Sequence, residues 1–199
     1  MLHIKSVSTE LLELLTRLMR QEEFKDFILV GGTALALQLG HRISVDIDMF
    51  GSCEIDESVF LENLKENGNV QVLKKSKNIL VCSVHGVKVD FVYYKYPLLE
   101  RPFENNHIRM AGMKDIAAMK INAIAGRGSK KDFIDIYYLL RYFTLDEMID
   151  LYLQKYNDGS EFLARKSLTY FEDAELEEMP LMFDNITWTE IKKTILDAQ

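Results

Sequence analysis

The stretch LVGGTALALQLGHRISVDIDMF, residues 29–50, contains the strongest structural signals in this chain. The apolar run Phe27–Val30 predicts a short buried strand that ends at a double glycine. Residues 33–39 then have the composition of a helix, and the alternation of apolar and acidic residues over 45–50 predicts a second strand. A strand, a helix and a second strand in this order indicate an architecture that mixes helices with a sheet.

The second strand carries two acids, Asp46 and Asp48, separated by one residue. Because side chains alternate along a strand, both carboxylates project from one face, while the intervening Ile47 faces the core. Two like charges so close repel each other unless a cation lies between them, and carboxylate oxygens suit a hard ion such as Mg²⁺. The pair therefore indicates a metal site or, as the alternative, a solvated strand face.

Gly31 and Gly32 lie between the first strand and the helix. Glycines have no Cβ, so the backbone can approach a ligand closely, and the unpaired N–H groups of a helix N-terminus favour an anion. The Thr33 hydroxyl adds a further donor. The pattern differs from GxxxxGK[ST] and from GxGxxG, but it predicts a phosphate-binding turn. A plain tight turn between strand and helix is the alternative.

A third acid, Asp90, lies in the strand-like segment HGVKVDFVYY, residues 85–94. The period of a strand places Lys88, Asp90 and Val92 on one face. An acid within an apolar run costs free energy when it is buried without a partner. A metal shared with the other two acids would supply that partner, whereas an exposed acid on an edge strand would need none.

The remaining sequence predicts a sheet-containing first half and a helical second half. His85-Gly86 between two apolar runs is a hairpin signal, and the prolines of segment 97–110 mark a boundary. We therefore expect an α+β fold, a small mixed sheet packed with helices, with an α/β domain at 1–100 and a helical domain at 101–199. The acidic segment 171–178 is expected to be a solvated helix face. The expected helices are 8–23, 56–66, 113–125, 130–142, 144–156, 160–170 and 187–197, and the further strands are 70–73, 78–84 and 87–94.

The composition is that of a globular protein, because 48% of the 199 residues are apolar and 28% are charged. A net charge of −7 argues against a protein that coats nucleic acid through bulk charge, although it is compatible with a local basic groove. The longest apolar stretch, 27–39, is too short to span a membrane, and no secretory signal precedes it. Cys53 and Cys82 lie far apart and predict free thiols, so we expect a cytoplasmic protein without membrane contact.

Charged residues cluster around the two glycines that separate a pair of predicted helices. Lys120 and Arg127 lie seven residues apart, which places them on one helix face. Ser129 and Asp132 have the spacing of a capping box that begins the next helix, and Asp135 lies one turn further on. Each set has a simpler alternative, since Asp132 can be only a helix cap and the cations can be surface charges.

Two segments, GGTALALQLGHRISVDIDMF (31–50) and KINAIAGRGSKKDFIDIYYLL (120–140), resemble the AbiEii/AbiGii nucleotidyltransferase family. Gly-Gly-Thr, then Asp-x-Asp, then a lone Asp on a later strand is similar to the wider DNA polymerase β-type nucleotidyltransferase superfamily. The turn at 41–44 makes the spacing longer than in the minimal nucleotidyltransferases that act on antibiotics, which suits the branch with toxins of type IV toxin–antitoxin systems. These motifs cover about residues 27–142.

The resemblance implies an enzyme that transfers a nucleoside monophosphate from an NTP, such as ATP or GTP, and releases pyrophosphate. It implies a two-metal Mg²⁺ site, triphosphate contacts from Lys120 and Arg127, and a helical domain that completes the active-site cleft. Asp132 or Asp135 would orient or deprotonate the acceptor. The metal candidates are Asp46, Asp48 and Asp90, which with Lys120, Asp132 and Asp135 are the catalytic candidates, and the nucleotide-binding candidates are Gly31, Gly32, Thr33, Arg42, Ser44, Lys120, Arg127 and Lys131.

The resemblance also suggests an acceptor and a partner. A tRNA end or another RNA is the expected acceptor, with a protein side chain or a small molecule as the alternatives, and an antitoxin regulator encoded nearby is the expected partner. An enzyme that modifies an antibiotic or another small molecule is one alternative, and a nucleotide-binding module without turnover is the other. The presence of all three acids argues against the module, because a protein without turnover does not require them.

Overall fold

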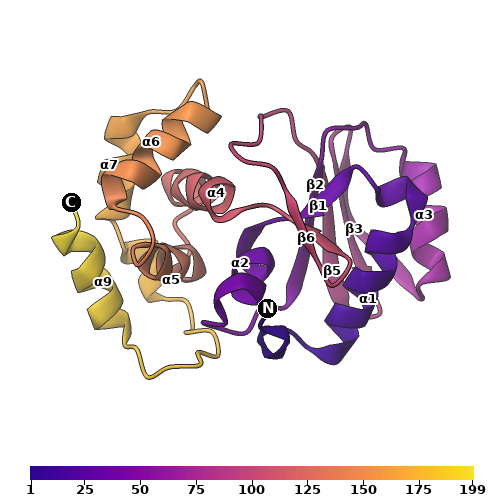
Figure 1. The fold of residues 1–199 in the computed structure, drawn as a ribbon, viewed down its shortest axis with the longest axis horizontal. Helices are drawn as coiled ribbons and strands as arrows, with labels where there is room; N and C mark the ends of the chain where they lie inside the picture. The colour runs from indigo at the N-terminus through magenta and orange to yellow at the C-terminus, as the bar shows by residue number, and fades with distance from the viewer. The chain divides into compact units, whose positions relative to one another are not determined.

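The computed structural model describes residues 1–199 and has an α+β fold, as the sequence predicts (Figure 1). A seven-stranded mixed sheet lies in the first half of the chain, and most helices lie in the second half. The residues group into two compact units. Unit 1 consists of Met1–Gly40, Ser44–Lys95 and Pro102–Ala111, and unit 2 consists of His41–Ile43, Tyr96–Arg101 and Gly112–Gln199. Separate domains at 1–100 and 101–199 stay a prediction.

Unit 1 contains the whole sheet. Its strands are β1 (Phe27–Leu29), β2 (Asp46–Gly51), β3 (Val70–Ser76), β4 (Ile79–Val84), β5 (Val87–Tyr93), β6 (Phe103–Asn105) and β7 (Ile108–Met110). They follow the order β3-β4-β5-β2-β1-β7-β6, in which β2–β5 and β1–β7 are parallel pairs and the others are antiparallel. β4 and β5 form the predicted hairpin, and its turn residues His85 and Gly86 have φ angles of 50° and 84°. Positive φ at both positions is typical of the tight turns that suit the twist of a hairpin.

Both edges of the sheet differ from the prediction. The segment 97–110, predicted only as a boundary, contains β6 and β7, and β7 extends the sheet by pairing with β1. Strands of three residues are too short to show a period, so the sequence pattern does not reveal them. β3 continues to Ser76 instead of ending at Leu73, with a bulge between Val72 and Lys74. Its exposed lysines interrupt the apolar pattern, as is common on an edge strand.

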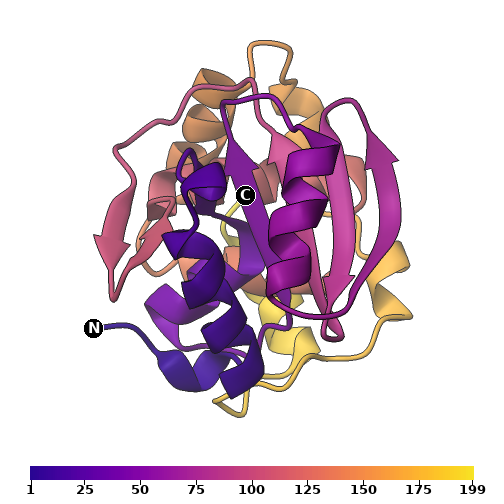
Figure 2. The same cartoon turned by 90° about the vertical axis from the view of Figure 1, so that its right-hand side faces the viewer.

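An aromatic cluster packs between one face of the sheet and the helices that cover it. The helices of unit 1 are η1 (Ile4–Ser6), α1 (Thr9–Arg20), η2 (Glu22–Phe24), α2 (Gly31–Leu39) and α3 (Glu57–Glu66). α1 and α3 lie over the same face (Figure 2). Phe91 of β5 packs there against Phe24 and Phe60, with ring centroids 4.8 and 5.2 Å apart. Because side chains alternate along a strand, the neighbouring Asp90 projects from the opposite face.

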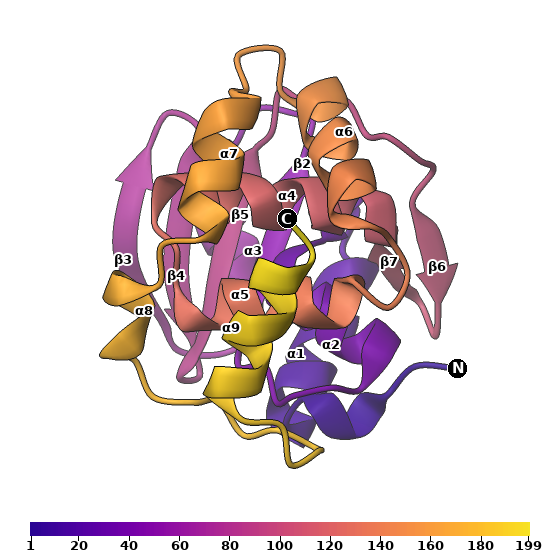
Figure 3. The ribbon, with the colours of Figure 1, turned by 90° about the vertical axis from the view of Figure 1, so that its left-hand side faces the viewer.

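Unit 2 is helical. Its helices are α4 (Met113–Gly126), α5 (Lys130–Leu139), α6 (Leu145–Lys155), α7 (Glu161–Leu168), α8 (Glu172–Glu175) and α9 (Trp188–Asp197). α6 and α7 pack on α4, and α9 packs on α5 (Figure 3). Thr144 and Thr187 each form a capping box, which explains why α6 and α9 begin where the sequence predicts. None of the helices combines the length and the apolar character that a membrane-spanning segment requires.

A fully buried ion pair attaches the segment 96–101 to the helices of unit 2. Lys155 Nζ lies 2.6 Å from Asp115 Oδ1, and both side chains are 0% exposed. Asp115 also accepts the backbone N–H groups of Leu99 and Glu100, and Lys155 donates to a carbonyl oxygen of the same segment. Because both charges are paired and hydrogen-bonded, the connection avoids the cost of an isolated buried ion and has a fixed path.

Candidate active site

The parallel pairing of β2 and β5 holds three acids on one face of the sheet. Asp48 is the register partner of Asp90, and Asp46 is the partner of Lys88. Register partners in neighbouring strands point to the same side of a sheet, so all four side chains share the face opposite the aromatic cluster. The strand period predicts that Asp46 and Asp48 share a face, but only the fold brings Asp90 into line beside Asp48.

The first turn of α2 lies directly against Asp48. Gly31 has a φ angle of +66°, and a Cβ atom at this position would lie 2.8 Å from Asp48 Oδ2. Glycine is favoured here, because a side chain would press on the carboxylate and would require a disfavoured backbone conformation. Gly32 follows in the same turn, where no side chain caps the helix. The N–H groups that a helix leaves unpaired at its N-terminus therefore lie beside a carboxylate.

α2 begins two residues earlier than predicted, at Gly31 rather than Thr33. The buried Thr33 hydroxyl donates to the Asp46 carbonyl oxygen, and Thr33 Oγ1 lies 2.9 Å from Ser44 Oγ. These contacts connect the start of α2 to the start of β2: the Thr33 hydroxyl bonds to backbone, and the Ser44 hydroxyl contacts Thr33. A contact of Thr33 or Ser44 with a phosphate stays a prediction.

The three acids do not form a closed metal-binding group in this structure. No set of three His, Cys, Asp or Glu side chains is arranged to hold a metal ion. Instead, the Lys88 ammonium lies 2.6 Å from both carboxylate oxygens of Asp90. The donor set nevertheless fits a hard divalent cation, because Asp46, Asp48 and Asp90 offer carboxylate oxygens and a positive charge already lies on one of them.

A second charged cluster lies within unit 2 and is centred on Asp135, which is 0% exposed. Arg42 donates to both carboxylate oxygens, with Nε 2.8 Å from Oδ1 and Nη2 2.9 Å from Oδ2. His41 Nε2 lies 2.8 Å from Oδ1, and Lys120 Nζ lies 2.6 Å from Oδ2. Arg42, a predicted nucleotide-binding residue, thus forms a buried bidentate pair here, and its contact with a nucleotide stays a prediction.

Asp132 lies beside this cluster and has three partners of its own. Lys120 Nζ lies 2.8 Å from Oδ1, and Arg127 Nε lies 3.2 Å from Oδ2. The Ser129 hydroxyl donates to Oδ2 at 2.7 Å. The predicted capping box is therefore wrong, because Ser129 occupies the N-cap position but accepts no backbone N–H. Lys120 and Arg127 both reach Asp132, and their contact with a triphosphate stays a prediction.

Opposite charges keep these acids ionised. Burial raises the pKa of Asp135, but the charges of Arg42 and Lys120, with their hydrogen bonds, hold it well below its usual value. Burial also raises the pKa of Asp132, yet the charges of Lys120 and Arg127 bring that pKa below its usual value. Burial lowers the pKa of Lys120, and the two carboxylates together raise it above its usual value. A carboxylate with a lowered pKa accepts a proton poorly, so these directions favour Asp132 and Asp135 as permanently charged groups over a general base. Deprotonation of an acceptor by either acid stays a prediction.

Two contacts in the structure have no counterpart in the sequence prediction. Lys88 is predicted only to share a face with Asp90, yet the two form an ion pair. Glu177, from the segment predicted as a solvated helix face, accepts the Lys130 backbone N–H at 2.8 Å and caps α5. A lysine two residues from an acid in a strand could have predicted the first contact from the sequence. Glu177 lies 47 positions from Lys130, so no local pattern predicts the second. Lys131, a predicted nucleotide-binding residue, is exposed at the same helix end.

Unit 1 thus combines a mixed sheet, acids in register on its parallel strand pair, and a glycine turn that opens a helix beside them. The sequence profile of the family described as "Nucleotidyl transferase AbiEii toxin, Type IV TA system" matches residues 13–70 and 84–199. The chain belongs to this family, which confirms the resemblance: it is a nucleotidyltransferase toxin of a type IV toxin–antitoxin system. Membership implies an NTP substrate and an antitoxin.

Individual proteins similar to this chain come from several bacteria. The uncharacterized protein aq_aa25 of Aquifex aeolicus (strain VF5) is 42% identical over 176 residues, 84% of each chain. JHP933 from Helicobacter pylori matches with a TM-score of 0.58 at 17% identity, over 95% of this chain and 85% of that one. MenT4, a nucleotidyltransferase toxin from Mycobacterium tuberculosis H37Rv, matches with a TM-score of 0.62 at 14% identity, over 95% and 80%. At these identities the two structural matches establish a shared fold.

We expect Gly31→Ala to lower the free energy of unfolding by about 1–2 kcal/mol, because a left-handed backbone disfavours a Cβ. The added methyl group would also press on Asp48. Gly126→Ala is the matched control, since a Cβ there meets nothing within 4 Å and the residue ends α4. Thermal unfolding measures both variants. Equal melting temperatures would contradict the constraint at Gly31.

Proposed function

We propose that the chain transfers a nucleoside monophosphate from an NTP to an acceptor hydroxyl, and that unit 1 binds the phosphates. One observation carries this proposal: the first turn of α2 touches the Asp48 carboxylate at Gly31, where a Cβ would lie 2.8 Å from Oδ2. A helix N-terminus attracts phosphate, and a carboxylate attracts a divalent cation. An NTP brings both a phosphate chain and a divalent cation, so one substrate satisfies both features.

The backbone of unit 1 would bind and orient this substrate. The N–H groups of Gly31 and Gly32 would donate to phosphate oxygens, and the link between Thr33 and Ser44 keeps this turn against β2. The acceptor oxygen then forms a bond to the α-phosphorus, the bond from that phosphorus to the leaving pyrophosphate breaks, and the proton of the acceptor hydroxyl passes to solvent. Catalysis of this kind depends mainly on positioning and on charge stabilisation.

Asp46, Asp48 and Asp90 are the residues that would hold a divalent cation such as Mg²⁺. A cation bound there would supply neutralisation of the phosphate charge and activation of the acceptor hydroxyl. The dependence on Mg²⁺ and the two-metal arrangement are parts of this proposal, because the family implies an NTP substrate and not a particular metal.

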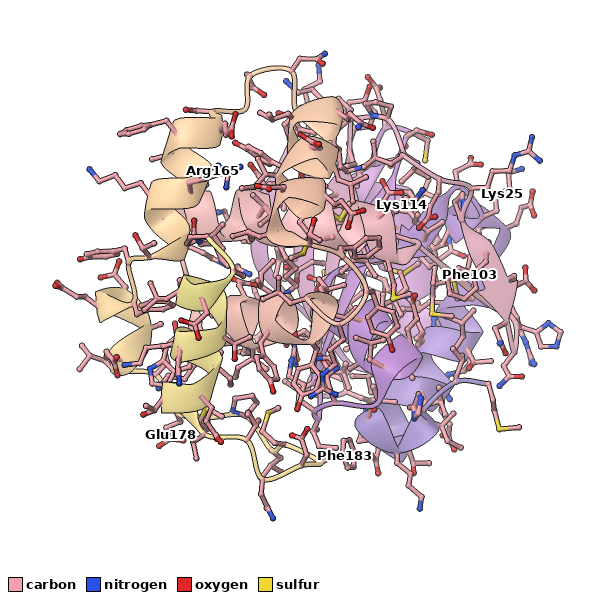
Figure 4. All side chains as sticks on the ribbon, turned by 60° about the vertical axis from the view of Figure 1, so that its left-hand side comes forward. Lys25, Phe103, Lys114, Arg165, Glu178 and Phe183 are labelled. Carbon is pink, nitrogen blue, oxygen red and sulfur yellow. The ribbon has the colours of Figure 1, made fainter.

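An RNA acceptor, such as a tRNA end, is compatible with the distribution of charge along the chain. Residues 144–199 carry 13 acidic and 5 basic side chains, a net charge of −8, whereas the whole chain has a net charge of −7. Residues 1–143 therefore carry 18 acidic and 19 basic side chains, a net charge of +1. The acidic surplus lies in the C-terminal part, where Glu178 and Phe183 precede α9 (Figure 4). The first 143 residues are therefore close to neutral, and a basic contact with RNA would be local, for example at the exposed edge strand β3, which carries Lys74 and Lys75.

The experiment that tests this function is incubation of the chain with each α-labelled NTP, Mg²⁺ and total RNA. We expect labelled RNA with at least one NTP, no label after addition of EDTA, and no label from the same NTP labelled at the γ-phosphate. The last control separates nucleotidyl transfer from phosphoryl transfer, because only the α-phosphate stays with the transferred group. The cytoplasm supplies both substrates and is the compartment that the proposal requires.

The same experiment distinguishes the competing functions. Label in a small-molecule fraction would favour modification of an antibiotic or a similar acceptor. Binding of an NTP without a labelled product in any fraction would contradict turnover and favour a nucleotide-binding module.

A further inference from the structure

The Lys88 ammonium is paired with the two Asp90 carboxylate oxygens that a metal ion would need as ligands. Lys88 lies in β5, two residues before Asp90 and in register with Asp46. Its ammonium is 2.6 Å from Asp90 Oδ1 and 2.6 Å from Asp90 Oδ2, so one cation engages both oxygens of the carboxylate. The Lys88 side chain is 42% exposed and the Asp90 side chain is 20% exposed. The pair is therefore accessible from solvent and open to exchange.

A lysine and a divalent cation cannot share this carboxylate at low cost. Both need the same lone pairs, and their positive charges repel each other at short range. The lysine can leave more easily than a buried partner could, because its ammonium is strongly hydrated and sits on a flexible four-carbon stem. Metal binding at Asp90 and pairing of Asp90 with Lys88 are therefore alternative states of one site.

We propose that Lys88 is a resident counter-ion, which holds Asp90 in the nucleotide-free chain and opposes the binding of a metal without a nucleotide. An incoming NTP with its divalent cation would displace the ammonium from Asp90 and offer it phosphate oxygens in exchange. Metal binding is thereby coupled to nucleotide binding. This inference rests on the proposed function, because it takes Asp90 as a metal ligand.

The test is a Mn²⁺ titration of the full chain without nucleotide. Electron paramagnetic resonance measures the free Mn²⁺ at each point and so gives the affinity. We expect Lys88→Met to bind Mn²⁺ about 10- to 100-fold more tightly than the unmodified chain, since a cation beside the ligand oxygens is removed. Lys88→Arg keeps the charge and should keep the weak affinity. Lys75→Met is the matched control: Lys75 Nζ lies 2.8 Å from Glu57 Oε1, and its strand position is in register with Leu80, on the opposite face from Lys88.

Two further variants make the result specific. Lys88→Gln repeats the measurement with a polar residue in case the methionine variant folds poorly. Combining Lys88→Met with Asp90→Asn should remove the gain in affinity, because the vacated carboxylate is then absent. An unchanged or weaker Mn²⁺ affinity in both uncharged variants, or an equal gain in Lys75→Met, would overturn the inference.

The transfer assay of the unmodified chain keeps this result separate from the proposed function. Labelled product together with an unchanged Mn²⁺ affinity in Lys88→Met would overturn the counter-ion role and leave the function intact. The absence of labelled product with every acceptor fraction would overturn the function itself.

Discussion

Asp48→Asn is expected to reduce nucleotide transfer by about 10²- to 10³-fold. The substitution removes a carboxylate charge beside the position proposed for the phosphates, where charge develops in the transition state. Asp48 is the acid that adjoins both other parts of the candidate site in unit 1. Its carboxylate lies against the turn at Gly31, and its register partner is Asp90. Asparagine keeps the shape of this half-buried side chain, so the melting temperature should stay close to that of the unmodified chain.

Asp56→Asn is the matched control for this prediction. Asp56 is also an aspartate of unit 1, but it caps α3 by accepting the backbone N–H groups of Ser58 and Val59. Asparagine is an equally good N-cap, so both stability and transfer should be unchanged. Transfer rates of the three proteins are compared at saturating NTP together with their melting temperatures. A variant at Asp48 that retains full activity would remove this acid from the catalytic machinery.

The shared face of the acids and the glycine turn in unit 1 are predictable because their signals are local. A period of two places Asp46 and Asp48 on one face, and a double glycine after a buried strand marks a close backbone approach. The sequence does not distinguish the two glycines, whereas the structure does: Gly31 has the positive φ angle and the contact with Asp48. It also does not predict the strand order, which decides that Asp90 rather than another acid lies next to Asp48.

Other features depend on contacts between distant residues, and no local pattern contains them. Ser129 and Asp132 have the spacing of a capping box, but the hydroxyl donates to an acid that two cations hold. Glu177 takes over the capping of α5 from another part of the chain. The short strands β6 and β7 are stabilised by their neighbours in the sheet rather than by their own sequence.

Asp135 is the clearest case of a residue whose sequence pattern suggests chemistry and whose surroundings indicate a structural role. The spacing of Asp132 and Asp135 marks both as candidates, yet it does not reveal that Arg42, 93 positions away, forms a bidentate pair with Asp135. The pair holds the segment His41–Ile43 within unit 2. The turn at 41–44 is thus anchored on α5 by this pair.

Asp135→Ala is expected to lower the free energy of unfolding by about 3–5 kcal/mol, because it leaves the buried charges of Arg42 and Lys120 without their shared partner. A loss of this size lowers the melting temperature of a domain by many degrees. Asp150→Ala is the matched control, since Asp150 is an exposed acid of α6 and its removal should change stability by less than about 0.5 kcal/mol.

The pH dependence gives the same prediction a second test with a definite sign. The pKa of Asp135 is depressed in the folded chain, so its contribution to stability is present above the unfolded value, about 3.9, and is lost as the pH falls through the folded pKa. The difference in unfolding free energy between the unmodified chain and Asp135→Ala should therefore be constant near neutral pH. It should shrink only in strong acid, once the pH is below the unfolded value. If Asp135→Ala has the melting temperature of the unmodified chain but has lost transfer activity, the structural role is contradicted. Asp135 would then take part in the reaction itself.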